Sequence, residues 1–291
     1  MRWRKRGLIY TPDGSKPWAM SHAMMPTPIL LNDGRIRLYI TCCDENMVGR
    51  VGYLDLDPAD PSRILAIATD PVLDIGEPGA FDDNGVCASC VVPVGEELRM
   101  YYVGFQLGTR VRYFMFSGLA VSNDGGENFE RHSTTPVLDR CEGETVVRTA
   151  PNVLQNGGGW SMWYVGGDCF ISVGGKMMPT YNVRYLESAD GRNWGGPGQV
   201  AIPLGGKLEF GLGRPFVSRQ GNHFVMWYSS RRQDIGYRIG YAESRNGTAW
   251  QRQDHMAGIG VSPTGWDAEM VCYATVLPTP TATYMFYNGN D

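Results

Sequence analysis

The stretch "GWSMWYVGG", residues 159–167, recurs in variant form along the chain. Its relatives are "LRMYYVGF" (98–105), "HFVMWYSS" (223–230) and "TYMFYNGN" (283–290), with a weaker copy, "IRLYIT" (36–41). Their middle aromatic residues lie 62, 62, 64 and 59 residues apart, at Tyr39, Tyr101, Trp163, Trp227 and Phe286. A period this regular, kept while the intervening residues change, predicts a repeat architecture.

Each repeat has the pattern of β-strands. Runs of β-branched and aromatic residues alternate with clusters of Gly, Asn, Asp and Pro, and no long stretch keeps an apolar period of 3.6 residues. A short apolar run precedes each aromatic strand, and turns such as Asn32-Asp33-Gly34 and Asn156-Gly157 separate the two. Because Asn and Gly tolerate the positive φ angles of tight hairpins, each repeat is predicted to open with a β-hairpin.

A second signature follows the hairpin. It has the forms "GLAVSNDGGENF" (118–129), "RYLESADGRNW" (184–194) and "GYAESRNGTAW" (240–250), each closing a third strand and leading into a fourth. Four antiparallel strands in each of five repeats predict an all-β fold, a five-bladed β-propeller around a central channel. We expect residues 1–291 to form one domain, with the N-terminal "KRGLIYTP" (5–12) adding a strand to the last blade. The alternative is an all-β sandwich whose aromatic residues recur by coincidence.

Charge and cysteine content limit the function classes. A net charge of -4 argues against a surface for nucleic acid or anionic membranes, and no apolar run resembles a signal peptide or a membrane span. Seven cysteines, an odd number, favour reduced thiols and a cytoplasmic protein. Cys87 and Cys90 form a CxxC pair without a second metal-binding motif, so we expect core thiols and neither a metal nor a cofactor.

Propeller geometry predicts where a site would lie. The loop entering the first strand of each blade and the loop leaving its second strand emerge at the same end of the channel, which we call the mouth. The polar residues predicted there are His22, Asp44, Asp82, Asp83, Glu144, Arg148, Asp168, Glu209, Arg214, Arg231, Asp267 and Glu269.

Carboxylates that converge on a narrow mouth shift one another's pKa values, because like charges close together cannot all ionise at low cost. Glycoside cleavage needs such a pair, one carboxyl protonated as the acid and one ionised as the base or nucleophile. Arginines beside them suit a carboxylate or phosphate on the ligand. The loop residues Trp18 and Trp266 could stack on a sugar ring. The alternative is that acids and arginines pair as structural ion pairs between blades.

The order "GAFDDNGVCASCVV", "MYYVGF", "GLAVSNDGG", "MWYVGG", "YRIGYAESRNGTAW" and "WDAEMVCY" resembles the five-bladed propeller glycosidases over nearly the whole chain. That superfamily includes glycoside hydrolase families 43, 32 and 68 and the mannoside phosphorylases of family 130. The chain is most similar to uncharacterised bacterial relatives met near surface-polysaccharide genes. Resemblance to families 43 and 32 implies an Asp entering blade one, where this chain has His22. Resemblance to family 130 implies phosphate binding by basic residues, here His22, Arg148, Arg214 and Arg231.

These observations predict a glycan-processing enzyme, a glycoside hydrolase acting on a polar or acidic glycoside of the surface-polysaccharide type. Asp83 is the expected base or nucleophile, Glu209 or Glu269 the acid, and Glu144 the residue that tunes their pKa values. His22, Asp44, Asp82, Arg148, Asp168, Arg214, Arg231 and Asp267 are expected to bind substrate. The alternatives are a phosphorylase using inorganic phosphate, a catalytically silent sugar-binding propeller, and a protein-interaction scaffold. The expected partner is a carbohydrate, neither nucleic acid nor membrane.

Overall fold

The computed structural model describes residues 2–290, and nearly all of its regular structure is β-strand. Blade one contains β1 (Ser21–Leu30), β2 (Ile36–Cys43), β3 (Gly49–Leu56) and β4 (Ile64–Ile67). Blade two contains β5 (Val86–Val94), β6 (Glu97–Leu107), β7 (Tyr113–Ser122) and β8 (Glu130–Arg131). Blade three contains β9 (Val147–Asn156), β10 (Gly159–Val173), β11 (Lys176–Ser188) and β12 (Gln199–Ile202). Blade four contains β13 (Glu209–Gln220), β14 (His223–Arg232), β15 (Gly236–Ser244) and β16 (Gln251–Arg252), and blade five β17 (Cys272–Pro278) and β18 (Thr283–Asn288).

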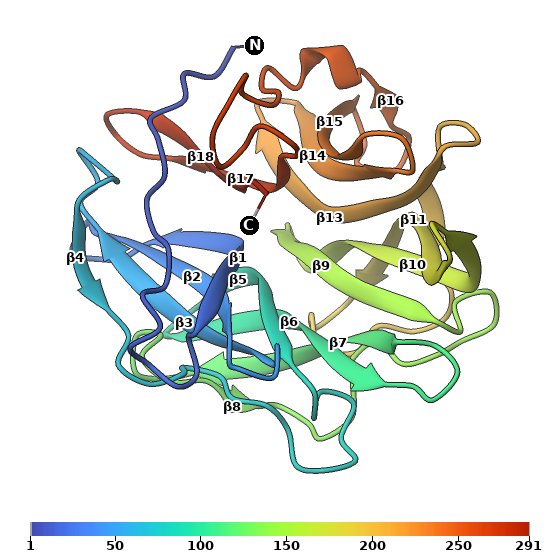
Figure 1. The fold of residues 1–291 in the computed structure, drawn as a ribbon, viewed down its shortest axis with the longest axis horizontal. Coiled ribbons are helices and arrows are strands. Elements are labelled where there is room, and N and C mark those ends of the chain that lie inside the picture. Colours follow the sequence, from blue (N-terminus) through green and yellow to red (C-terminus); the bar gives the residue numbers. More distant parts are fainter. Residues whose placement is uncertain (1, 291) are drawn as a thin grey trace.

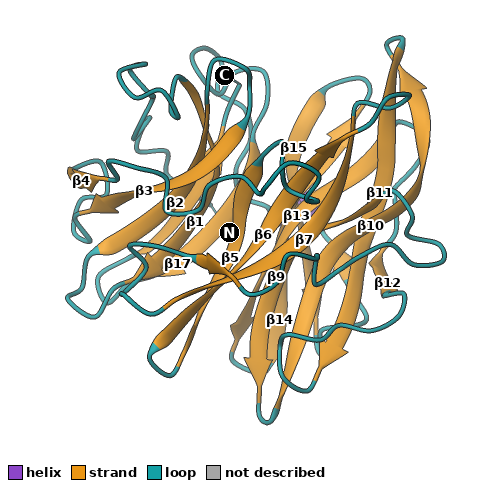
Figure 2. Cartoon of the chain, turned by 90° about the horizontal axis from the view of Figure 1, so that it is seen from below, coloured by secondary structure: helices purple, strands orange, loops and turns teal. Residues whose placement is uncertain are grey.

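The blades follow one another around a centre, with their first strands innermost (Figure 1). Within each blade, successive strands pair antiparallel, and the strands run through the thickness of the molecule (Figure 2). Neighbouring blades also meet through short parallel pairings, Phe116 with Arg148 and Tyr181 with Gly211. The predicted all-β propeller is therefore confirmed. A single 3₁₀ turn, η1 (Asp254–Met256), follows β16, and among the described residues no helix is long and apolar enough to cross a bilayer.

The recurring middle aromatics lock successive blades together. The Tyr39 hydroxyl donates to the Gly126 carbonyl (3.1 Å), the Tyr101 hydroxyl to Gly191 (2.6 Å) and the Trp163 indole to Gly247 (2.7 Å). Each acceptor lies in the signature loop of the next blade.

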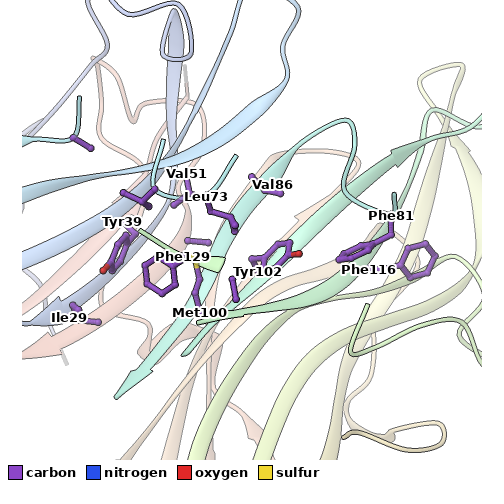
Figure 3. Packing of buried hydrophobic residues seen from close by; sticks show 14 residues of the cluster. Ile29, Tyr39, Val51, Leu73, Phe81, Val86, Met100, Tyr102, Phe116 and Phe129 are labelled. Carbon is purple, nitrogen blue, oxygen red and sulfur yellow. The ribbon is translucent and has the colours of Figure 1, made fainter. Parts of the chain in front are cut away.

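Each of these aromatics also packs edge-to-face on the aromatic that closes that signature. The partners are Phe129, Trp194 and Trp250, with ring centroids 5.6, 6.4 and 6.3 Å away. Figure 3 shows Tyr39 beside Phe129 in the core between blades one and two. We call each combination of hydrogen bond and ring pair a blade clasp.

Blade five departs from the prediction. Residues 5–12 form no strand, because their backbone makes no ladder hydrogen bonds in the described structure. The segment nevertheless lies against blade five: Ile9 and Tyr10 pack in the cluster that contains Phe286. Further upstream, Trp3 packs edge-to-face on Trp227 at 6.2 Å, and its backbone amide donates to the Gly258 carbonyl (3.1 Å). The N-terminus therefore supplies an aromatic contact to the last junction without forming the expected strand.

We predict that Trp3→Ala destabilises the propeller, because Trp3 covers the buried Trp227 ring at this junction. Loss of a half-buried indole should lower the free energy of unfolding by about 2 kcal/mol. Urea unfolding followed by circular dichroism measures the change. Leu8→Ala, in the same segment at a side chain that is 51% exposed, is the matched control. Equal stability of the two variants would show that Trp3 does not fasten the blade.

Candidate functional site

Antiparallel pairing gathers the predicted residues at one end of the channel. Val86 at the start of β5 pairs with Gly104 near the end of β6, and Cys272 pairs with Asn288 in the same way. The entry and exit loops of each blade therefore share the mouth, as the sequence predicts.

The innermost strands are bulged near the mouth. Met25, Ala150, Arg214 and Tyr273 have φ angles of 57°, 50°, 43° and 56°, each at a break in the pairing register. This left-handed conformation costs roughly 1–2 kcal/mol per residue for side chains other than glycine. Bulges and strained residues of this kind cluster at functional sites, where they redirect side chains and free backbone groups.

Arg214 spans the axis of the propeller. Its guanidinium donates to the carbonyls of Tyr273 (2.8 Å) and Pro26 (2.7 Å) and to the Thr27 hydroxyl (2.6 Å), so it joins blade four to blades five and one. The side chain is 1% exposed and has no carboxylate partner in the described structure. Burial therefore lowers its pKa to about 10. These bonds support a role in positioning the blades rather than the predicted contact with substrate.

Arg231, at the end of β14, remains free of acidic partners among residues 2–290. Its guanidinium carbon lies 5.0 Å from the Phe210 ring centroid and 5.2 Å from that of Tyr237. Burial alone would lower its pKa, but Tyr237, Tyr181 and Tyr113 raise the pKa above its ordinary value, so the side chain stays charged. A guanidinium held beside aromatic rings suits an anion such as a carboxylate or a phosphate. We call Arg231 and these four aromatic residues the arginine cradle.

Two predicted mouth acids are buried in hydrogen-bonded ion pairs. Asp82 accepts from the Tyr102 hydroxyl (2.8 Å) and from Arg131 Nε (2.9 Å). Glu144 accepts from the Tyr164 hydroxyl and Arg148 Nε, both at 2.7 Å, and from Arg184 at 3.1 Å. Both carboxylates are fully buried.

Two further acids repeat the arrangement. Glu209 accepts from Arg252 at 2.8 and 2.9 Å, and Asp267 from Lys5 Nζ (2.7 Å) and the Tyr287 hydroxyl (2.8 Å). Burial alone would raise both pKa values, yet the hydrogen bonds from Arg252 and from Lys5 outweigh it and hold each pKa below its ordinary value.

Four of the predicted acids therefore belong to structural ion pairs, which was the alternative to a substrate site. Asp82, Glu144, Glu209 and Asp267 are at most 5% exposed, and each accepts hydrogen bonds from a basic side chain and from a hydroxyl group. Arg148 belongs to the Glu144 pair and also donates to the carbonyls of Asp139 and Gly196. These five residues are occupied by the fold, which argues against the catalytic and substrate-binding roles expected of them.

The remaining predicted acids differ from one another. Asp83 is half-buried, joins no ion pair in the described structure, and accepts one hydrogen bond, from the Gly79 amide (2.8 Å). Glu269 and Asp168 are exposed and likewise free of ion pairs in that part of the chain. Asp44 instead holds its own turn, through Arg50 (2.8 Å) and the amide of Asn46 (2.8 Å).

His22 and Trp266 line a cavity of about 150 Å³ between blades one and five. Trp266 stacks on Tyr287 with ring centroids 5.3 Å apart, and the segment Gly7–Pro12 covers one side. Trp18, the other loop tryptophan, lies against Gly52 and donates to the Thr69 carbonyl (3.0 Å), so it anchors its loop.

Cys87 and Cys90 lie buried in β5 as free thiols, and burial raises their pKa values to about 12 and about 11. Over residues 2–290, no three His, Cys, Asp or Glu side chains gather closely enough to hold a metal ion.

Sequence reasoning missed the mouth tyrosines, Tyr113, Tyr181, Tyr237 and Tyr273. Tyr113 begins β7 and Tyr237 lies one residue after β15 begins, so each follows the tip of a second hairpin. An aromatic at or next to the start of the third strand in blades two and four is the signal that could have placed Tyr113 and Tyr237 at the mouth.

Comparison with known proteins gives two sequence relatives from Mycobacterium tuberculosis and a set of similar folds. The uncharacterised protein Rv1502 of Mycobacterium tuberculosis H37Rv is 34% identical over 290 residues, which cover 100% of this chain and 95% of that protein. No family model matches the chain.

Among solved structures, a putative glycosidase from Bacteroides thetaiotaomicron VPI-5482 has a TM-score of 0.73 and 17% identity, covering 98% of this chain and 92% of its own. An α-L-arabinofuranosidase from Lactobacillus brevis has a TM-score of 0.71 and 9% identity, covering 91% and 82%. At these identities the likeness shows the fold: the chain has the fold of the propeller glycosidases, as the sequence resemblance implied.

We predict that Glu209→Gln destabilises the protein, because Glu209 is buried in an ion pair with Arg252. Removing one partner of a buried ion pair should lower the free energy of unfolding by about 3 kcal/mol. Because the folded-state pKa of Glu209 is depressed, its stabilising contribution is complete above the unfolded pKa of about 4.3 and disappears as pH falls through the folded value. Urea unfolding between pH 2 and 7 should therefore show a shallower acid loss in Glu209→Gln than in the parent. The exposed Glu269→Gln is the control, and an unchanged Glu209→Gln profile would contradict the structural role.

Proposed function

The chain belongs to the family of the uncharacterised Mycobacterium tuberculosis protein Rv1502, and we propose that it is a glycan-processing enzyme whose site is the channel mouth. Its substrate would be a glycoside that carries an anionic group. The arginine cradle is the observation that carries this proposal. Arg231 is charged, half-buried and free of carboxylate partners in the described structure, whereas the buried acids Asp82, Glu144, Glu209 and Asp267 are each paired with a base.

The aromatic surroundings favour a sugar as the body of that ligand. The ring centroids of Tyr237 and Tyr273 lie 5.7 Å apart near Arg231, and Trp266 lines the cavity between blades one and five. Aromatic faces with polar edges pack on the apolar face of a sugar ring and hydrogen-bond its hydroxyls. The group bound by Arg231 would then be a carboxylate or phosphate on the glycan.

For hydrolysis, Asp83 and Glu269 are the predicted catalytic residues that the fold leaves available. One carboxyl would protonate the glycosidic oxygen as the bond to the anomeric carbon breaks. The other, ionised, would take a proton from the attacking water or attack the anomeric carbon directly. Asp83, half-buried in the entry loop of blade two, is our choice for the base or nucleophile, and Glu269 for the acid.

A second candidate function is glycoside phosphorolysis, and the same cradle favours it. Four mouth acids are held in ion pairs, and Arg231 is a half-buried cation that no carboxylate of residues 2–290 neutralises. Inorganic phosphate bound by Arg231 could attack the anomeric carbon while the glycosidic C–O bond breaks, which gives a sugar 1-phosphate and an alcohol that takes a proton from the phosphate or from Glu269. His22 on blade one is the other basic residue of the mouth that could bind the phosphate. We keep the cytoplasm as the expected compartment, which the seven free thiols support.

A release assay tests the proposal. The protein is incubated with aryl glycosides and with acidic bacterial surface glycans, with and without inorganic phosphate. Phosphate-independent release supports the hydrolase, and phosphate-dependent release of a sugar 1-phosphate supports the phosphorylase. Binding without release in either condition would overturn both and indicate a silent sugar-binding propeller.

We predict that Asp83→Asn lowers kcat/KM by at least about 100-fold on any glycoside that the protein hydrolyses, because the amide cannot act as base or nucleophile. The unfolding midpoint should stay unchanged, since Asp83 joins no ion pair in the described structure. Glu142→Gln, an exposed acid of the next entry loop, is the matched control. Full activity of Asp83→Asn would remove Asp83 from the site.

We further predict that Arg231→Met weakens binding of the anionic substrate, or of phosphate, by about tenfold or more, since a hydrogen-bonded ion pair contributes about 1.5–3 kcal/mol. Arg231→Lys should restore part of the affinity, because it keeps the charge but loses the planar donor set. Arg232→Met is the control, as the neighbouring Arg232 already pairs with Asp234 at 2.8 Å. Isothermal titration calorimetry measures the affinity of the three variants for the ligand. Equal affinities of Arg231→Met and Arg232→Met would refute the role of the arginine cradle in binding.

A further inference from the structure

Three loops at the mouth expose large apolar side chains. Leu107 at the β6–β7 turn is 58% exposed, and Met177 at the β10–β11 turn is 47% exposed. On blade four, Leu208 is 45% exposed just before β13, and its carbonyl accepts a hydrogen bond from the Gln233 amide (2.9 Å) in the β14–β15 turn. We call residues 107–112, 173–177 and 207–208 the rim tips.

Each rim tip also carries exposed bases next to its apolar side chain. In chain order they are Arg110 and Arg112, Lys176, and Lys207. None of them pairs with an acid among residues 2–290, and the rim tips contain no Asp or Glu.

The acids close to the rim tips in sequence do not cancel this charge. Glu209 and Asp234 are paired with Arg252 and Arg232, and Asp168 is exposed at the base of the β10–β11 hairpin. The net charge of -4, from which we expected no membrane surface, therefore does not describe this part of the molecule. Locally the surface is basic.

Contacts between the blades hold the rim tips on one side of the mouth. Phe170, in the part of β10 beyond its bulge, packs in the same cluster as Phe105 and Phe114, which flank the β6–β7 turn. On its other side, blade three meets blade four where Tyr181 pairs with Gly211, three residues after Leu208. The bases of the three loops are therefore fixed to one another, while their tips remain exposed.

This arrangement suits a lipid surface better than a protein partner. The apolar side chains stand on separate tips, whereas a stable protein interface needs a contiguous area of about 800 Å² on each partner. Apolar side chains that enter the boundary between headgroups and acyl chains, beside bases that contact anionic headgroups, are the two elements of binding at a membrane surface. Blade one lacks the second element, because its exposed Met47 lies beside the exposed Glu45.

We propose that the rim tips dock the propeller onto an anionic lipid surface. Leu107, Met177 and Leu208 enter the headgroup region, and the bases beside them contact lipid phosphates. The mouth then faces the membrane at a tilt, with blades two to four nearest to it. This docking does not depend on the glycan chemistry at the mouth. A corollary that does rest on the proposed function is that the glycan substrate is carried on a lipid.

Co-sedimentation with lipid vesicles tests the docking on the 291-residue protein, without any glycan present. Its outcome is therefore independent of the release assay. We expect binding to phosphatidylcholine vesicles that contain phosphatidylglycerol, and no binding to vesicles of phosphatidylcholine alone. Binding should weaken as salt screens the bases.

Charge reversal tests the basic half of the surface. The double variant Lys176→Glu/Lys207→Glu should bind anionic vesicles at least about tenfold more weakly, because each new acid is repelled by the lipid phosphates. The matched control is Arg219→Glu/Arg245→Glu, which changes two exposed arginines at the opposite end of the channel and should keep binding.

Serine substitution tests the apolar half. The triple variant Leu107→Ser/Met177→Ser/Leu208→Ser should also bind at least about tenfold more weakly, because serine gains nothing from leaving water. The matched control is Leu65→Ser/Ile67→Ser/Val200→Ser, at side chains 43%, 40% and 42% exposed on the outermost strands β4 and β12. Because the replaced rim-tip side chains are exposed, the triple variant should keep the parent's unfolding midpoint, which circular dichroism measures.

Three results would overturn the proposal: no binding to anionic vesicles, equal binding to both kinds of vesicle, or rim-tip variants that bind as well as their controls. Analytical ultracentrifugation of the protein alone gives a fourth. Self-association that the triple rim-tip variant abolishes would assign these tips to a second copy of the chain instead of a lipid surface.

Discussion

The blade clasp is the interaction on which the rest of the structure depends. One buried hydroxyl or indole must reach one glycine carbonyl of the next blade, so both the length of the repeat and the angle between blades are constrained together. At Gly126, with φ of 88°, the requirement is also steric, because a Cβ there would lie 2.1 Å from the Tyr39 hydroxyl oxygen. The repeated "MWY" and "DG" stretches are therefore two halves of one contact. The two stretches recur along the chain because each blade junction needs the same hydrogen bond and ring contact.

A second constraint acts beside the clasp and decides what the mouth can do. An acid at the start of an innermost strand is close to the tyrosine that follows the middle aromatic, and burial there requires a base. Arg131, Arg148, Arg252 and Lys5 meet that need in four blades. Acids that a sequence places at a propeller mouth can thus belong to the scaffold. What remains for a ligand is the charge that the scaffold does not use, which here includes the guanidinium of Arg231 and the carboxylates of Asp83 and Glu269.

The fold could be predicted from the sequence more fully than the site, because the two depend on different kinds of contact. The period of the aromatics is a local pattern, so the propeller and its mouth could be predicted from residues such as Tyr101 and Trp163. The pairing of Asp82 with Arg131 and of Glu209 with Arg252 joins residues 49 and 43 positions apart, and no local pattern in the acids reports it. The prediction of a strand at the N-terminus was wrong for a related reason. The need for a further strand in the last blade suggested a strand over residues 5–12, whereas the spacing of Trp3 and Lys5 repeats that of Phe129 and Arg131 and carries the blade-five contacts.

The two axial arginines show how strand position divides structural from functional charge. Arg214 lies on an innermost strand, where bulges in the other blades turn the carbonyls of Pro26 and Tyr273 toward the axis, so its two terminal nitrogens donate to the protein. Arg231 lies on a second strand, where its neighbours are the rings of Phe210 and Tyr237, which hold the guanidinium in place without accepting its hydrogen bonds strongly. Arg214 is held by hydrogen bonds within the protein. Arg231 has no carboxylate partner in the described structure, so we propose that an anionic ligand pairs with it. In this propeller Arg214 therefore joins blade four to blades five and one, and we propose that Arg231 selects what enters the mouth.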